Sequence, residues 1–260
     1  MVRENPIEST DDMILFTRAL SQSNTIERLA FTGNGNENAQ ALLSGVDLSA
    51  YKYLDLIGNL QTNGQTDISD LIAANTPLAE LFLDENRLND DDAELIARSL
   101  GRNAHLMRLT LCGNTCNIQE RGMRDLYEAV NDTSSLNALS DSNHSCRVEG
   151  LSLRFDLQAI NTRDGSNALA VNRMCKIHKV MVQRYREGGG NVPHLNTEMG
   201  GENYVRLAPY LLESVVRRHD AFLEENHEKY IESFERSLGL LYEVVKDWKM
   251  AELFSFIGRK

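Results

Sequence analysis

Apolar residues recur at a fixed spacing through the first half of the chain, in the order leucine-x-x-leucine-x-leucine-x-x-asparagine. The copy that begins at Leu78 is the clearest, and the copy that begins at Leu106 repeats it. Successive side chains of a strand point to opposite faces, so positions one, four and six of each copy are expected to face a core. The copies begin at Ile26, Tyr51, Leu78, Leu106 and Leu136.

The asparagine at the ninth position predicts a sharp inward turn after each strand. Its amide can satisfy backbone groups of the neighbouring copy that would otherwise lack partners. The segment after it is predicted to be a helix, most clearly 90–100, whose first turn is acidic and so suits the helix dipole. Equivalent helices are expected at 66–74 and 119–130, and an N-terminal capping helix at 11–21.

A repeated strand and helix at a period of about 28 residues predicts an α/β leucine-rich-repeat solenoid, a curved parallel sheet with helices on its convex side. We assign residues 1–150 to this solenoid, with about five repeats. In the fifth copy Leu136 and Leu139 fit, but Asp141 occupies an inward position. A degraded last repeat is expected where a solenoid ends in water.

These repeats resemble the ribonuclease-inhibitor type of leucine-rich repeat, and the block from Leu78 to Leu106 matches that consensus at nearly every core position. The segment from Ser142 to Cys146 with its helical tail is similar to leucine-rich-repeat proteins of stramenopile algae. The first resemblance implies the fold of less than half the chain. The family includes inhibitors of ribonuclease and an activator of a small GTPase, but both have about twice as many repeats.

Residues 151–260 are predicted to form a mainly α-helical C-terminal region. A basic amphipathic helix is expected at 166–187, then a glycine-containing loop at 188–201 and helices at 204–218 and 221–256. The basic positions suit an exposed helix face or docking on the acidic repeats better than a nucleic-acid or membrane stripe. The apolar stripe of the first helix is Leu169, Ile177, Val180, Met181 and Tyr185, and its basic residues are Arg173, Lys176, Lys179, Arg184 and Arg186.

Composition changes this picture only in the choice of partner. The first ten residues contain no apolar signal segment, and no apolar run is long enough to span a bilayer, so a cytoplasmic protein is expected. Residues 1–150 contain 23 Asp and Glu and 11 Lys and Arg, a balance of −12, whereas 151–260 contain 15 and 16, a balance of +1. An acidic repeat region favours a basic protein partner and disfavours nucleic acid and membrane.

No motif predicts chemistry. The candidate metal ligands are Cys112, Cys116, His144 and Cys146, but Cys116 and Cys146 occupy the same position of the repeat, where Leu88 stands in the third copy. Stacking alone would then bring the two thiols together as small apolar residues, so we expect no metal site and no cofactor. The histidines and the glycine run match no catalytic motif, and an enzyme is not expected.

The concave face of the strands is the strongest candidate site. Tyr53, Ile57 and Phe82 occupy outward strand positions and are expected to lie near one another, rimmed by charge, which is the composition of an interface hot spot. The predicted function is non-catalytic binding of a protein on this face. The alternative is regulation of a small GTPase or inhibition of a nuclease. The predicted binding residues are Arg28, Thr32, Tyr53, Asp55, Ile57, Glu80, Phe82, Asp84, Arg108 and Thr110.

Overall fold

The computed structural model describes residues 7–23, 25–60, 66–115, 117–151, 156–163, 168–187, 191 and 194 of the 260-residue chain. The described residues of 7–131 and 142–169 form one compact unit, here the sheet unit, and those of 132–141 and 170–194 form a second, here the helical unit. The expected loop at 188–201 falls almost entirely outside the described residues, and the expected helices at 204–218 and 221–256 do so completely.

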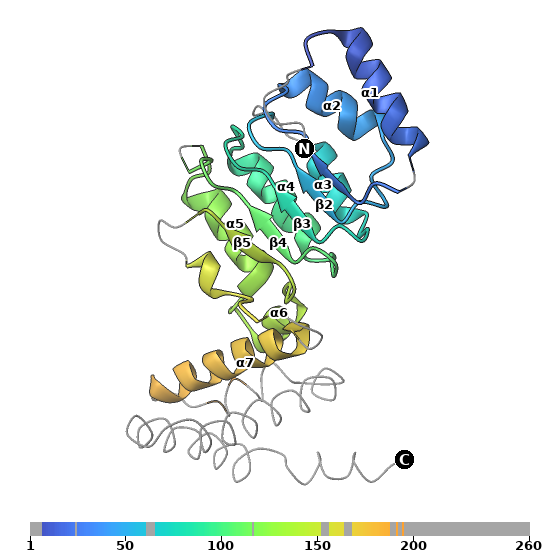
Figure 1. The fold of residues 1–260 in the computed structure, drawn as a ribbon. Helices are drawn as coiled ribbons and strands as arrows, with labels where there is room; N and C mark the ends of the chain where they lie inside the picture. Colours follow the sequence, from blue (N-terminus) through green and yellow to red (C-terminus); the bar gives the residue numbers. More distant parts are fainter. Residues whose placement is uncertain are drawn as a thin grey trace, which may run out of the picture. The chain divides into compact units, whose positions relative to one another are not determined.

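The sheet unit is an α/β structure around a five-stranded parallel sheet whose strand order follows the chain (Figure 1). The strands are β1 (Arg28–Ala30), β2 (Tyr53–Asp55), β3 (Glu80–Phe82), β4 (Arg108–Thr110) and β5 (Arg147–Glu149). Their central residues are in register and all buried: Leu29, Leu54, Leu81, Leu109 and Val148. The predicted core positions of the first four copies are therefore confirmed, except that Ile26 is only partly buried.

Helices follow the strands, and α4 packs against both α3 and α5. Their N-terminal signals lie in the sequence: Asn89 accepts hydrogen bonds from the first turn of α4, and Asp92 reciprocates as a capping box. Helix α2 was not among the helices expected from the sequence. The helices are α1 (Thr10–Gln22), α2 (Asn36–Gly45), α3 (Thr66–Ala73), α4 (Asp90–Leu100), α5 (Glu120–Asn131), α6 (Leu136–Asp141), the short 3-10 helix η1 (Leu157–Ala159) and α7 (Ala168–Arg186).

The asparagines of the ninth position form the predicted ladder. Asn86 Oδ1 accepts the backbone N–H of Asn59 at 2.8 Å and of Leu60 at 2.6 Å, and its Nδ2 donates to the carbonyl of Leu56 at 3.2 Å. Asn114 makes similar contacts one strand further on. Its Oδ1 accepts the backbone N–H of Leu88, and its Nδ2 donates to the carbonyl of Leu83. Buried backbone groups at each turn thus gain partners from the next repeat.

A second ladder lies where the chain enters the later strands, and the sequence reading missed it. Asn103 Nδ2 donates to the carbonyl of Ile72, Asn143 Nδ2 donates to the carbonyl of Asn103, and Asn161 Nδ2 donates to the carbonyl of Asn143. The distances are 2.7, 2.7 and 3.0 Å, and all three asparagines are buried. This ladder connects the segment before β4 with the segment before β5 and with the turn after η1.

The fifth strand does not lie at Leu136, where it was predicted. Leu136 and Leu139 are buried, but they lie in α6, and Asp141 is the exposed last residue of that helix. The fifth strand is Arg147–Glu149, because Asn143 Oδ1 accepts the N–H groups before it as Asn103 does before β4. Both α5 and α6 lie between β4 and β5, so counting one period from Leu106 reached a helix.

In the helical unit, α7 confirms the expected amphipathic helix with two corrections. Ile177 and Met181 are fully buried as expected, whereas Leu169 is exposed. Lys176 is also buried and not on the expected basic surface, and burial lowers the pKa of its ammonium to about 7. Arg173 donates to the carbonyl oxygen of Ser140 at 2.7 Å, so this arginine joins α7 to α6 instead of marking a ligand stripe.

Candidate functional site

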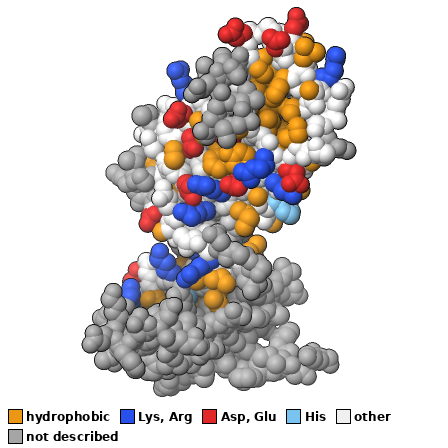
Figure 2. Space-filling model, viewed as in Figure 1, with side chains coloured by type: hydrophobic (Ala, Val, Ile, Leu, Met, Phe, Trp, Pro, Cys, Tyr) orange, Lys and Arg blue, Asp and Glu red, His pale blue; other side chains and the backbone are white. Residues whose placement is uncertain are grey.

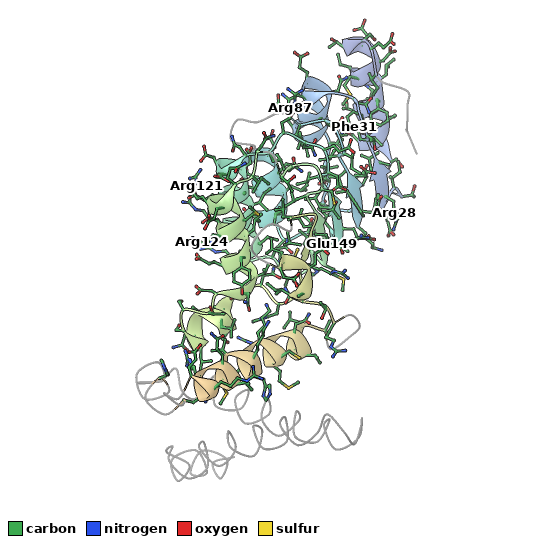
Figure 3. All side chains as sticks on the ribbon, turned by 90° about the vertical axis from the view of Figure 1, so that its left-hand side faces the viewer. Arg28, Phe31, Arg87, Arg121, Arg124 and Glu149 are labelled. Carbon is green, nitrogen blue, oxygen red and sulfur yellow. The ribbon has the colours of Figure 1, made fainter. Side chains whose placement is uncertain are left out.

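The strand face is the set of side chains that alternate with the buried strand residues and point away from the core. The first residues of the strands form one row across it: Arg28, Tyr53, Glu80, Arg108 and Arg147. The third residues form the next row: Ala30, Asp55, Phe82, Thr110 and Glu149. In Figure 3 the labelled Arg28 and Glu149 lie on the opposite side of the sheet unit from Arg121 and Arg124 of α5.

Two aromatic rings and two guanidinium groups form a stack across this face. The ring centroids of Tyr53 and Phe82 lie 4.9 Å apart at an interplanar angle of 41°. The guanidinium carbon of Arg28 lies 4.1 Å from the Tyr53 centroid, and that of Arg108 lies 5.3 Å from the Phe82 centroid. Both arginines are within the range of cation–π attraction. The expected proximity of Tyr53 and Phe82 is confirmed.

Ion pairs lie at both ends of the stack. Arg108 donates through Nε and Nη2 to Glu149 Oε2, at 3.2 and 2.8 Å, and Arg147 Nε lies 3.0 Å from Glu149 Oε1. Arg28 lies 3.9 Å from Glu80. The hydrogen bonds that Arg108 donates to Glu149 raise the pKa of its guanidinium. Figure 2 shows basic and acidic side chains side by side in a band over the strands, next to apolar side chains.

Four predicted binding residues are held within the face itself. Asp55 is 2% exposed, and its Oδ1 accepts from the Thr32 hydroxyl at 3.3 Å and from the Ile57 N–H at 3.1 Å. Asp84 accepts from the hydroxyl of Thr110, which is 3% exposed. The expectation of exposure is therefore wrong for Asp55 and Thr110, because each short side chain is hydrogen-bonded to a polar side chain of the preceding repeat.

The other eight predicted residues, including Thr32 and Asp84, have accessible surface. Arg28 and Arg108 are exposed, whereas Tyr53, Glu80 and Phe82 are half-buried. Thr32, Ile57 and Asp84 are half-buried as well, and the expected proximity of Ile57 to the two rings stays a prediction. The structure thus gathers the candidate surface around the first row of the strands.

Arg147 and Glu149 belong to this surface and were missed, because the fifth strand had been placed at Leu136. Their signal was available: Asn143 stands before Cys146 as Asn103 stands before Leu106. The alternation Arg-Val-Glu then repeats the outward and inward order of the earlier strands. Reading the asparagine before each strand, as well as the one after it, would have located β5.

Cys146 does not occupy the repeat position predicted for it. Cys146 is fully buried immediately before β5, and its N–H is bonded to Asn143 as that of Leu106 is to Asn103 before β4; burial raises the pKa of the Cys146 thiol. Its assignment to the position of Cys116 and Leu88 is therefore wrong, and Cys116 lies outside the described residues. Within the described residues, no group of three or more His, Cys, Asp or Glu side chains is arranged to hold a metal ion.

No helix in the described part of the chain is both long enough and apolar enough to cross a membrane. No family model matches the chain, and no curated protein is found as a relative. Among solved structures, the tropomodulin C-terminal domain of Caenorhabditis elegans is similar, with 12% sequence identity and a TM-score of 0.44. The match covers 67% of this chain and 99% of that one. A likeness of this size carries no argument about function.

Proposed function

We propose that this chain is a non-catalytic protein–protein interaction module and that its partner binds on the strand face. The carrying observation is the stack of Tyr53 and Phe82 between Arg28 and Arg108 on the side of the sheet away from the core. Aromatic and arginine side chains dominate interface hot spots, because they bury large areas at low conformational cost.

The proposed architecture is a leucine-rich-repeat solenoid of the ribonuclease-inhibitor-like type in residues 1–150, joined to a helical region in 151–260. The parallel strands in chain order, the successive helices and the asparagine ladder support it. In a repeat array, each strand contributes side chains at equivalent positions to the same face. A partner that spans several strands therefore meets a continuous surface. We place the protein in the cytoplasm and assign it no cofactor.

The test is a comparative capture experiment with the full chain. Tyr53→Ala combined with Phe82→Ala removes both rings, and each such truncation at a hot spot costs about 2 kcal/mol or more of binding free energy. Proteins retained from a lysate by the unaltered chain should be lost by the double variant and kept by Arg124→Ala, a control on α5. Quantitative mass spectrometry provides the comparison.

Thermal melts decide how a loss of capture is read. A double variant that melts near the unaltered chain and still retains the same proteins contradicts the proposal. A large fall in melting temperature would mean that the rings contribute mainly to the core. A small GTPase or a nuclease among the proteins lost by the double variant would identify the module as a regulator of that protein.

A further inference from the structure

The charged side chains of the strand face differ in their exposure to solvent. The side chains of Arg28, Arg108 and Arg147 are 66%, 44% and 42% exposed, whereas those of Glu80 and Glu149 are 34% and 16% exposed. The arginine side chains are therefore more exposed to solvent than the glutamate side chains that pair with them. An approaching molecule meets the positive ends of these pairs first.

The other two acids of the face are engaged with neighbouring groups. Asp55 is buried and accepts two hydrogen bonds from the face, as described above. Asp84 is half-buried, and accepts from the Thr110 hydroxyl at 2.9 Å and the Cys112 N–H at 2.6 Å. The arginines are therefore the most exposed of these charged side chains, although residues 1–150 carry a net −12.

The arginines are also ordered before any partner binds. Arg28 is held over Tyr53, and Arg108 is held over Phe82 and by Glu149. The hydrogen bonds of Arg108 to Glu149 use two of the five N–H groups of a guanidinium. A charged group that is already fixed loses less conformational entropy on binding and suits the planar, bidentate recognition of a carboxylate.

We propose that the segment bound on the strand face is an acidic protein segment, in which Asp or Glu side chains flank an apolar or aromatic side chain. The apolar side chain lies against Tyr53 and Phe82, and the carboxylates lie against Arg28, Arg108 and Arg147. This inference rests on the proposed function and reverses the partner charge expected from net charge alone. Acidic side chains of the repeats that lie more than about 8 Å away act weakly here, because salt at physiological ionic strength screens charges at such separations.

A display experiment with random peptides tests the partner's chemistry. The full chain is immobilised, bound peptides are sequenced, and the two most enriched peptides are synthesised for titration. Peptides with Asp or Glu beside Phe, Trp, Leu or Tyr should be enriched. Arg28→Glu with Arg108→Glu should weaken their binding by about tenfold or more, because it places like charges in contact. Arg124→Glu on α5 is the matched control and should leave binding unchanged.

The outcomes separate the two proposals. Enrichment of Lys- and Arg-containing peptides whose binding needs Tyr53 and Phe82 overturns the acidic partner and leaves the proposed function standing. Enrichment of acidic peptides whose binding is unaffected by Arg28→Glu with Arg108→Glu also overturns it. Absence of any peptide whose binding depends on the two rings overturns the proposed function, and this inference with it. Melting curves of each variant accompany the titrations.

Discussion

Asn86 and Asn89 lie close in sequence and stabilise different parts of the sheet unit. Asn86 satisfies three backbone groups of the preceding repeat, whereas Asn89 caps α4 through the N–H groups of Asp91 and Asp92. The cap makes the contribution of Asn89 comparable to that of other helix N-caps, at about 1 kcal/mol.

Asn86→Ala should therefore lower the free energy of unfolding by about 3 kcal/mol, because it leaves buried donors and an acceptor without partners. Asn89→Ala should lower it by about 1 kcal/mol. Urea titrations followed by circular dichroism measure both values. Equal losses for the two variants would be inconsistent with an asparagine ladder that carries more stability than a helix cap.

Gly150 follows β5 at a point where a side chain has no room. Its φ is +92°, and a Cβ there would lie 2.3 Å from the backbone nitrogen of Cys112. Gly33 also has a positive φ, +68°, but nothing lies within 4 Å of its Cβ position. The two glycines share a backbone conformation that disfavours L side chains and differ in the space around them.

Gly33→Ala should cost about 1–2 kcal/mol from backbone conformation alone. Gly150→Ala should cost about 1–3 kcal/mol more, because β5 must move away from Cys112. Chemical denaturation of the two variants measures the difference. A Gly150→Ala variant as stable as Gly33→Ala would contradict the close approach of the chain after β5 to Cys112.

At the scale of single elements, α7 contains a pH-dependent contribution to stability. Burial lowers the pKa of Lys176 from 10.5 to about 7. Between these two values the unfolded chain binds more protons than the folded chain at this residue, so stability should rise as pH increases from about 7 to about 10. Below about pH 7 both states carry the proton, and the contribution of Lys176 to the pH dependence ends.

Lys176→Met should raise the melting temperature at pH 7 and flatten the rise of stability between pH 7 and 10. The expected gain at pH 7 is on the order of a few kcal/mol, because the neutral side chain has no charge to desolvate. Lys179→Met, at an exposed position of the same helix, is the control and should change little. Identical pH profiles for the unaltered chain and Lys176→Met would contradict the burial of this ammonium group.

The whole sheet unit depends on one continuous core. A single cluster of buried residues extends from Met13 in α1 to Leu157 in η1, and Leu83 lies in it with no exposed surface. Leu83→Asp should unfold the sheet unit, because an unpaired buried carboxylate costs several kcal/mol, comparable to the total stability of a domain. Arg87→Asp, at an exposed position, is the control. The melting transition followed by circular dichroism should disappear for Leu83→Asp and persist for Arg87→Asp.

Local patterns determined most of the sheet unit. Side chains alternate along a strand, so Leu54, Leu81 and Leu109 had to face inward, and the ninth-position asparagines had to satisfy the backbone that each turn leaves unpaired. The acidic first turn and the capping residues also placed α4 at 90–100. These features depend on residues close in sequence, and the sequence alone therefore specified them.

Tertiary structure decided what depends on contacts between repeats. The extra helix α6 lengthens the segment between β4 and β5 beyond one repeat period. The repeat spacing therefore does not locate β5, and the place of Arg147 and Glu149 on the candidate face is seen only in the folded chain. Burial of Asp55 and Lys176 depends on what packs over them, which alternation along one strand or helix does not specify. The exposure of each charged side chain on the strand face is set by packing between neighbouring strands. That exposure determines which charges a partner meets.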